Sequence, residues 1–297
     1  MENFSCLLCD YDKAIVVNNK VRDSGEHKIV KCEKCGHVQI YPLPSVEGDK
    51  EFYDNDTQSK NVNGILDIKS IEEKSRYDTE RRKRLILENA DKCSKVLEIG
   101  CGYGFLVNEL KTAGYTVDGI EISDSRREIA KEICQKNIFN INLMEDNIPN
   151  NMRQKYDAIL LFQVLEHIIN PKIFLKNIKE LLSSDGIVII EVPNLNDHLL
   201  KLCNQYNQFF WQRAHLSYFS PLILKSLFKE LGFKNINVYG TQRYSIVNMM
   251  NWYINEKPEI KDPTYETVDD LKWIDEYYKN KLSRGLKSDT LVLIAKK

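Results

Sequence analysis

Three glycines at alternating positions follow an acidic residue in the run Glu98-Ile99-Gly100-Cys101-Gly102-Tyr103-Gly104. An apolar segment, 95–99, leads into the glycines, and a helix-compatible segment, 105–113, follows them. A strand, a glycine turn and a helix form a cradle for a nucleotide-like cofactor, because glycine permits close backbone approach and the helix amides face the turn. The dinucleotide fingerprint G-x-G-x-x-G fails, since Phe105 or Val107 stands where its third glycine belongs.

Four cysteines form two C-x-x-C pairs near the start of the chain, Cys6 with Cys9 and Cys32 with Cys35. Such pairs turn two thiolates each toward one metal ion, and four thiolates complete the tetrahedral coordination of zinc. We therefore predict a closed, structural zinc site. Two disulfides and an iron centre also fit this spacing, although a cytoplasmic protein keeps its thiols reduced.

Two of the five histidines stand where a ligand site is expected. His167 follows the apolar run 156–162, so a parallel sheet would place it at the carboxyl edge where ligands bind. His215 stands just before a predicted helix, 220–231. An imidazole titrates near neutral pH and can take a proton from an acceptor hydroxyl. We predict His215, and with it His167, as the base or acceptor-orienting residue; a structural hydrogen-bonding role is the alternative.

Strand and helix patterns alternate along the chain and would position these groups. Apolar runs predict strands, several of them covered on both faces, at 95–99, 116–121, 139–144, 156–162, 186–192, 234–239 and 291–295. Helical patterns occur at 71–90, 105–113, 124–136, 171–182 and 220–231. The first of these helices would turn Leu85, Ile86 and Leu87 inward. The alternation predicts an α/β fold with a mainly parallel sheet.

The chain divides into three predicted parts. Residues 1–45 form the zinc-binding module, which is too small to fold without a metal or disulfides. Residues 46–70 form a connector, and residues 71–297 form the α/β domain. An insertion at 241–287, rich in Tyr, Trp, Asn and Asp, separates the last two strands. We predict that it is a lid over a ligand; a helical hairpin that only packs is the alternative.

Charge and composition exclude several classes of partner. The formal net charge is −1, and the first 60 residues hold 8 Lys+Arg against 11 Asp+Glu. A phosphate-binding surface needs cations, so nucleic acid is not an expected partner. No run of about 18 apolar residues occurs, which predicts no membrane insertion. The N-terminus lacks the features of a secretory leader, so we expect a cytoplasmic protein; the sequence leaves its oligomeric state open.

The glycine run closely resembles motif I of class I S-adenosylmethionine-dependent methyltransferases. Three further features match this family in order: Glu121 after the second strand, 145–149 after the third, and 156–167, similar to the family's fourth strand and its Glu-His ending. The resemblance implies S-adenosyl-L-methionine as cofactor and a Rossmann-like sheet, mainly parallel with an antiparallel last strand. It also implies contacts from Glu121 to the ribose and from 145–149 to the adenine. The implied cofactor-binding residues are Glu98, Gly100, Cys101, Gly102, Tyr103, Gly104, Glu121, Ile122, Asp146, Asn147 and Gln163.

The cysteine module followed by this domain resembles bacterial methyltransferases, many of which act on nucleotide-linked sugars or surface-polysaccharide precursors. This resemblance implies a small acceptor, sugar-linked or phosphorylated. Sugar C-methyltransferases of this layout carry Tyr-x-Glu-His where residues 212–215 are Gln-Arg-Ala-His, so we favour O-methylation. A sugar C-methyltransferase, an rRNA or tRNA methyltransferase that binds RNA through the module, and an inactive scaffold are the alternatives. The residues expected to contact the acceptor are Tyr53, Arg213, Tyr218, Arg243 and Tyr244.

Overall fold

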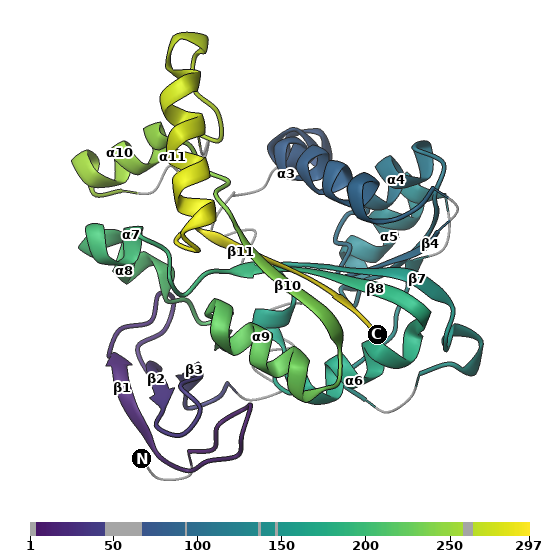
Figure 1. Cartoon of the computed structure of the whole chain (residues 1–297), viewed down its shortest axis with the longest axis horizontal. Coiled ribbons are helices and arrows are strands. Elements are labelled where there is room, and N and C mark those ends of the chain that lie inside the picture. Colours follow the sequence, from purple (N-terminus) through teal and green to yellow (C-terminus); the bar gives the residue numbers. More distant parts are fainter. Residues whose placement is uncertain (1–3, 45–66, 93, 136–137, 146–147, 258–263) are drawn as a thin grey trace.

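The computed structural model describes residues 4–44, 67–92, 94–135, 138–145, 148–257 and 264–297. Its centre is a seven-stranded sheet in the order β10-β11-β8-β7-β4-β5-β6 (Figure 1). The strands are β4 (Lys95–Ile99), β5 (Thr116–Ile120), β6 (Ile138–Phe139), β7 (Tyr156–Phe162), β8 (Leu182–Pro193), β10 (Lys234–Thr241) and β11 (Thr290–Lys296). Strand β11 runs antiparallel to both of its neighbours, and the other pairs are parallel. The mainly parallel sheet with an antiparallel last strand confirms the predicted topology.

The strand order reverses at β4 and β7, which lie side by side while the chain continues outward from each of them. Ligands of open α/β sheets bind outside the carboxyl ends of the strands at such a point. The glycine turn follows β4, and His167 follows β7 within the short turn η2 (Leu165–His167). The two groups that the sequence singled out therefore share one edge of the sheet.

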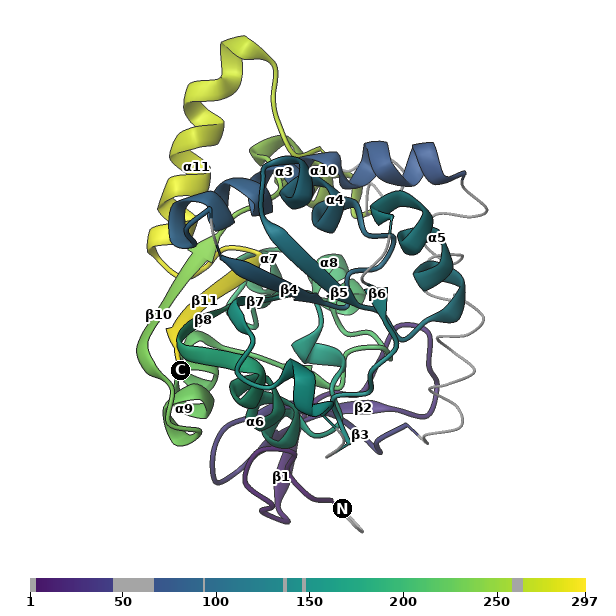
Figure 2. The same ribbon diagram turned by 90° about the vertical axis from the view of Figure 1, so that its right-hand side faces the viewer.

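Helices cover both faces of the sheet (Figures 1 and 2). One face carries α3 (Ile68–Asn89), α4 (Phe105–Thr112) and α5 (Asp124–Cys134), and the other carries α6 (Pro171–Leu181) and α9 (Pro221–Glu230). Helix α3 begins at Ile68 rather than at residue 71, because the Asp67 carboxylate caps it by accepting a hydrogen bond from Ser70 N at 2.8 Å.

Two local predictions are wrong. The strand predicted at 139–144 ends at Phe139, the last residue of β6. Asn142 closes a turn there, since its side-chain oxygen accepts from Met144 N at 3.1 Å and competes with the hydrogen bonds of a strand. On α3, Ile86 is buried but Leu87 is 42% exposed, so the inner face of this helix is narrower than predicted.

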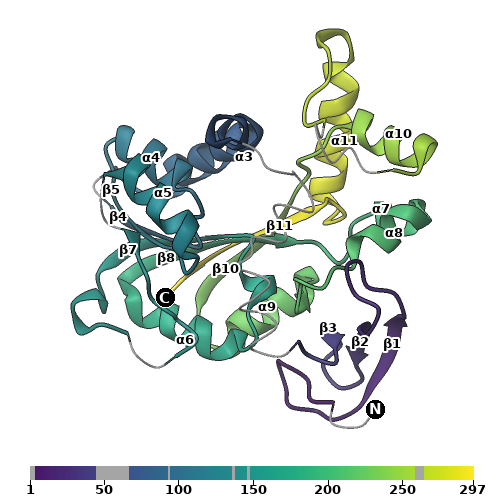
Figure 3. The same cartoon turned by 180° about the vertical axis from the view of Figure 1, so that it is seen from behind.

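The insertion between β10 and β11 contains α10 (Ile246–Asn255), η3 (Asp269–Leu271) and α11 (Lys272–Arg284). Helices α10 and α11 project from the sheet, with α7 (Leu199–Leu202) and α8 (Asn204–Phe210) between them and the N-terminal module (Figures 1 and 3). Trp252 of α10 packs with Leu199 and Cys203, so the insertion shares a small apolar cluster with the segment that contains α7 and α8. Its role as a lid stays a prediction. Among the helices described, none has the length and apolar character needed to cross a membrane.

The N-terminal module is a small antiparallel sheet whose last strand comes from far along the chain. Strands β1 (Ala14–Asn18), β2 (Lys28–Cys32) and β3 (Val38–Tyr41) pair in order, and β9 (Ser217–Tyr218) adds to β3. Val38 of β3 pairs with Tyr218 of β9. The sheet of the N-terminal module therefore includes residues from beyond the predicted boundary at residue 45. Its last strand, β9, consists of residues just after His215.

Candidate active site

The turn after β4 takes backbone angles that glycine adopts most readily. Gly100, Gly102 and Gly104 have φ values of 71°, 55° and 79°. A Cβ atom at Gly100 would lie 2.6 Å from Val164 Cγ2, so this turn touches the segment that leads to His167. A Cβ atom at Gly102 would meet no other atom within 4 Å. The backbone of the turn is therefore open to a ligand at Gly102.

Two buried carboxylates flank the glycine turn. Glu121 accepts hydrogen bonds from two backbone amides, Gly102 N at 2.8 Å and Ser123 N at 2.9 Å. Glu98 is 5% exposed, and its Oε2 finds no hydrogen-bond partner in the described part of the chain. Burial, together with the charge of Glu121, raises the pKa of Glu98 to about 7, while Arg82 opposes this shift. An unpaired buried carboxylate beside an open backbone suits a ligand that carries a cation.

His167 and His215 lie against each other, with ring centroids 5.0 Å apart and ring planes at 74°. The Nδ1 of His167 lies 2.7 Å from the carbonyl oxygen of Ala214. A carbonyl oxygen only accepts, so we assign the proton of the neutral ring to Nδ1 and the lone pair to Nε2. The lone pair of His167 is thereby directed away from the backbone.

Burial holds both imidazoles in the neutral form. It lowers the pKa of His167 to about 4, although the hydrogen bond to Ala214 works against this shift. It lowers the pKa of His215 well below the usual range, and the charges of His167 and Arg22 add to the effect. At neutral pH both rings can therefore accept a proton or a hydrogen bond.

Hydrogen bonds fix the segment that carries His215. Leu216 N donates to the carbonyl oxygen of Glu166 at 2.8 Å, which joins this segment to η2. The side-chain nitrogen of Gln212 lies 3.0 Å from His215 Nε2. The Tyr218 hydroxyl accepts from Gln212 N at 3.0 Å and donates to Gln212 O at 3.1 Å. Tyr218, predicted to contact the acceptor, is 2% exposed. Its hydroxyl supports the backbone of Gln212, which contacts His215.

Arg22 of the N-terminal module reaches the same segment, and sequence reasoning missed it. Its guanidinium donates to Gln212 Oε1 at 2.8 Å and lies 3.9 Å from the centroid of the Phe209 ring. Its backbone N–H donates to Trp211 O at 2.7 Å. No local pattern could have indicated Arg22, because its side-chain partner lies 190 residues away along the chain.

A buried ion network joins α3 to β8 and was also missed. Glu191 of β8 is fully buried and binds Arg81 at 2.7 Å and Arg82 at 2.6 Å. Arg243 joins the network through Asp78, at 3.3 Å. The available signal was a carboxylate inside an apolar strand together with adjacent arginines on a helix. Because Arg82 also acts on Glu98, this network shapes the electrostatics beside the glycine turn.

The four cysteines of the module converge. Their Sγ atoms all lie within 4.8 Å of one another, with Cys6 and Cys35 3.5 Å apart and Cys9 and Cys32 3.6 Å apart. Four sulfurs bound tetrahedrally to zinc, each at about 2.3 Å, stand roughly 3.8 Å from one another. The cluster therefore has the dimensions and the soft donor set of a tetrathiolate metal site.

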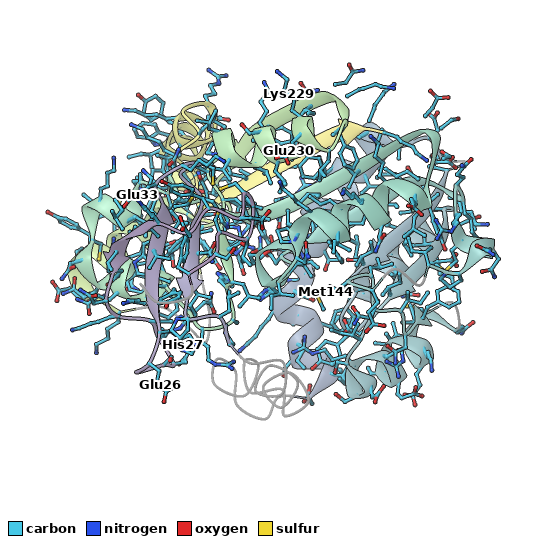
Figure 4. The ribbon with its side chains drawn as sticks, turned by 90° about the horizontal axis from the view of Figure 1, so that it is seen from below. Glu26, His27, Glu33, Met144, Lys229 and Glu230 are labelled. Atoms are coloured by element: carbon cyan, nitrogen blue, oxygen red, sulfur yellow. The ribbon has the colours of Figure 1, made fainter. Side chains whose placement is uncertain are left out.

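The histidines nearest to these cysteines in sequence are engaged elsewhere. His37 Nε2 lies 3.1 Å from Ser217 Oγ, across the junction of β3 and β9. His27 Nδ1 lies 2.5 Å from Ser24 Oγ, and His27 stands with Glu26 at the rim of the module (Figure 4). The cysteines thus form a complete four-ligand set without either histidine.

A family model described as a methyltransferase domain matches residues 71–238. The chain belongs to this methyltransferase family. The match begins in α3 and ends in β10, so it includes the glycine turn, Glu121, His167 and His215. The methyltransferase domain uses S-adenosylmethionine, and the unpaired Glu98 carboxylate and the open backbone at Gly102 fit a cofactor with an ammonium group.

Curated relatives of the methyltransferase match part of this domain. The ubiquinone biosynthesis O-methyltransferase of Actinobacillus pleuropneumoniae is 32% identical over 107 residues, which is 34% of this chain and 46% of the relative. The enzyme of the same name from Rickettsia typhi is 32% identical over 101 residues, which is 34% of this chain and 41% of the relative. The chain therefore spans less than half the length of these relatives.

Solved structures share the fold. An S-adenosylmethionine-dependent methyltransferase from Archaeoglobus fulgidus has a TM-score of 0.52 at 18% identity, covering 76% of this chain and 98% of that one. Magnesium protoporphyrin IX methyltransferase from Synechocystis PCC 6803, with bound SAH, has a TM-score of 0.52 at 14% identity, covering 84% and 98%. The predicted Rossmann-like methyltransferase fold is confirmed.

The remaining cofactor residues predicted for the methyltransferase differ in exposure. Cys101 is buried, and burial raises the pKa of its thiol. The thiol therefore stays protonated and unreactive at neutral pH. Tyr103 and Gln163 are half-buried, and Ile122 is 53% exposed. Their contacts with the cofactor stay predictions. Asp146 and Asn147 lie outside the described residues.

The predicted acceptor contacts among the described residues lie in two segments, one around His215 and one after β10, and their contacts with an acceptor stay predictions. Arg243 already has carboxylate neighbours, Asp78 at 3.3 Å and Asp289 at 3.7 Å, and its guanidinium donates to the Tyr244 hydroxyl at 2.8 Å. Arg213 is half-buried and lies beside Arg22, to whose carbonyl oxygen its backbone N–H donates at 3.3 Å. Tyr53 lies outside the described residues.

Proposed function

We propose that this protein transfers the methyl group of S-adenosylmethionine to a hydroxyl oxygen of a small molecule. The observation that carries the proposal is a pair of neutral histidines in ring contact, His215 buried and His167 half-buried, beside the glycine turn at the carboxyl edge of the sheet. In such a transfer the acceptor oxygen attacks the methyl carbon in line with the bond to sulfur, and S-adenosylhomocysteine leaves. The protein mainly aligns the acceptor and handles the proton of its hydroxyl.

His215 is the proposed base or acceptor-orienting residue, and His167 is its partner. Both rings are neutral at pH 7, so each has one lone pair for the hydroxyl of an acceptor, which at His215 would replace the contact with the Gln212 amide. Gln212, held by Tyr218 and Arg22, contacts the ring of His215 and sets its orientation. A ring held in this way loses little conformational entropy when it meets an acceptor, which favours catalysis.

Glu121, Glu98 and the glycine turn are the proposed cofactor contacts. Glu121 would accept from the ribose hydroxyls, and the two amides that already hold it keep its carboxylate in place. Glu98 would receive the ammonium group of the methionine part, for which its unpaired oxygen is available. Asp146 and Asn147 are proposed for the adenine side from the sequence alone.

The cysteine cluster is proposed to hold a structural zinc ion, in a cytoplasmic protein that keeps its thiols reduced. Its size and donor set support this assignment. With four protein ligands the ion has no open position, so its contribution is to hold the module together. The module in turn pairs β3 with β9, next to His215.

Two acceptor classes are proposed in order. The first is a sugar or phosphorylated precursor of a surface glycan; the layout of the chain supports it, and Arg22 and Arg213 provide cations near His215. The second is a hydroxyl of a small precursor in quinone biosynthesis, which is favoured by the relatives named ubiquinone biosynthesis O-methyltransferases. An RNA acceptor receives no support from the acidic module.

The test is transfer of a labelled methyl group from S-adenosylmethionine to a panel of nucleotide sugars, sugar phosphates, catechol-type phenols and RNA. The expected product is a methyl ether of one small-molecule class, formed at least about 100-fold more slowly by the His215→Gln variant. Calorimetry with S-adenosylmethionine runs in parallel. Methylation of RNA alone would overturn the acceptor assignment, and a failure to bind the cofactor would favour the inactive scaffold.

A further inference from the structure

A second group of metal-ligating side chains lies at the site itself. Glu166, His167 and His215 each offer a ligand atom, and these three atoms lie within 4.8 Å of one another. Glu166 and His167 belong to η2, and His215 is brought to them by the hydrogen bond between Leu216 N and Glu166 O. The group is separate from the four cysteines, whose donors are all sulfur.

The side chain of Glu166 has no hydrogen-bond partner among the described residues, which is the most informative fact about this group. Glu166 is 1% exposed, and both of its side-chain oxygens lack a hydrogen bond in the described ranges of the chain. The nearby guanidinium groups are committed elsewhere, Arg82 to Glu191 at 2.6 Å and Arg243 to Asp78 at 3.3 Å. Burial raises the pKa of Glu166 to about 8, so without a cation the site holds a neutral carboxyl group, and a bound cation would displace its proton.

The orientation of His167 also suits a metal ligand. Histidines that bind a metal through one ring nitrogen commonly donate the other N–H to a carbonyl or carboxylate. His167 makes such a contact, with Nδ1 2.7 Å from Ala214 O. Its Nε2 then lies 3.9 Å from Glu166 Oε1. Two ligands at about 2.1 Å from one ion stand roughly 3 to 3.5 Å apart, so a bound ion would draw these side chains closer together.

We propose that Glu166, His167 and His215 bind a divalent transition-metal ion, such as Mn²⁺, Fe²⁺ or Zn²⁺. Two imidazoles and one carboxylate form a donor set of intermediate hardness that leaves coordination positions open. The open positions would take oxygen atoms of the acceptor, and a bound cation lowers the pKa of a hydroxyl that it contacts. The part assigned to the ion in the reaction rests on the proposed O-methyl transfer. The existence of the metal site does not depend on that function.

The reaction is balanced without a redox step. The acceptor hydroxyl releases its proton to water, and its oxygen forms a bond to the methyl carbon. The bond between that carbon and the sulfonium sulfur breaks, and the electron pair remains on sulfur in S-adenosylhomocysteine. A bound ion would hold the acceptor oxygen and stabilise its developing negative charge. His215 and His167 would then fill the acceptor-orienting role through the ion, and water would take the proton.

Manganese is the appropriate probe, because this ion prefers nitrogen and oxygen donors and discriminates against the thiolates of the module. The full-length protein is treated with a mild chelator, and its residual zinc is counted by elemental analysis. Mn²⁺ is then titrated with electron paramagnetic resonance of the free ion as the readout. We expect one Mn²⁺ per chain, with affinity reduced at least about tenfold in Glu166→Gln and in His215→Gln.

A matched control is His198→Gln, because His198 contacts Asp197 at 3.4 Å and is not one of the three proposed ligands. This variant should bind Mn²⁺ as the wild type does. No saturable binding of Mn²⁺, Fe²⁺ or Zn²⁺ beyond the cysteine site, in protein that still binds S-adenosylmethionine, would overturn the proposal. Binding that survives both Glu166→Gln and His215→Gln would overturn it too.

Activity separates this inference from the proposed function. If the function is correct and the ion has the proposed role, methyl transfer falls after chelation and returns with Mn²⁺. Unchanged transfer in chelated protein would remove the ion from the reaction and leave the methyltransferase assignment intact. Specific Mn²⁺ binding without transfer to any hydroxyl acceptor would keep the site and reject O-methylation.

Discussion

The cofactor turn and the histidine pair lie on the same edge of the sheet but are built in opposite ways. The turn at 98–104 comes from one continuous stretch, and Glu121, which completes it, follows the neighbouring strand β5. The histidine pair joins η2 to a segment 48 residues further on, and Arg22 of the N-terminal module braces that segment. One half of the site is local, and the other depends on long-range packing.

This difference assigns a separate task to each part of the molecule. The cofactor turn is held by the sheet and a flanking helix, because Gly100 N and Cys101 N donate to Ile120 O of β5 and Cys134 Sγ of α5 donates to Gly104 O. The position of His215 also requires the cysteine module, whose strand β3 pairs with β9 two residues beyond it. Damage to the module should therefore disable acceptor chemistry and spare cofactor binding.

The largest expected effect comes from Cys32→Ser. Loss of a thiolate ligand should release the metal and unfold the module, since such sites couple metal binding to folding. Methyl transfer should fall by up to about 10,000-fold, because both histidines lose their alignment. The dissociation constant for S-adenosylmethionine should change less than about twofold. Cys203→Ser, a buried cysteine outside the cluster, is the control, and a fully active Cys32→Ser protein would refute the division of tasks.

The next largest effect is expected for His215→Gln. This change keeps a polar side chain of similar size but removes the basic nitrogen, so turnover should fall about 100-fold. Cofactor affinity, measured by calorimetry, should match that of the wild type. His198→Gln should leave both quantities unchanged. A parallel loss of cofactor affinity in His215→Gln would mean that the two halves of the site are not independent.

Glu121→Gln tests the local half of the site. The variant leaves backbone donors and the proposed ribose contact poorly satisfied, so the affinity for S-adenosylmethionine should weaken by about 1–3 kcal/mol. Turnover at saturating cofactor should stay near that of the wild type. Glu128→Gln, on the exposed face of α5, serves as the control. Equal affinity in the wild type and Glu121→Gln would remove Glu121 from the cofactor site.

The smallest effect is expected in the pH dependence of cofactor binding. Burial raises the pKa of Glu98 to about 7, so below that pH its carboxyl is increasingly protonated and cannot pair with an ammonium group. Affinity should therefore fall as pH decreases from 8 to 6, by at most about tenfold per pH unit. Glu98→Gln should show weaker affinity without this slope. An identical slope in the variant would assign the titration to another group.

The sequence by itself determined the order of the seven strands of the central sheet and of α3, α4, α5, α6 and α9, as well as the cofactor turn and the C-x-x-C spacing of the cysteines. Each of these depends on residues close in the chain: glycines with positive φ after a strand, Ser220 as the cap of α9, and cysteines with two residues between them. Only a few local choices failed, such as the strand at 139–144, where the Asn142 side chain hydrogen bonds within a turn.

Only the tertiary structure decided how the histidine half of the site is assembled. It placed Arg22 on Gln212, completed the module with β9, and left the Glu166 side chain beside two imidazoles without a hydrogen-bond partner among the described residues. It also committed Arg243 to Asp78 rather than to open solvent. The reason is physical: hydrogen bonds and ion pairs between residues far apart in the chain arise only when packing brings them together, and no local pattern of side chains encodes that distance.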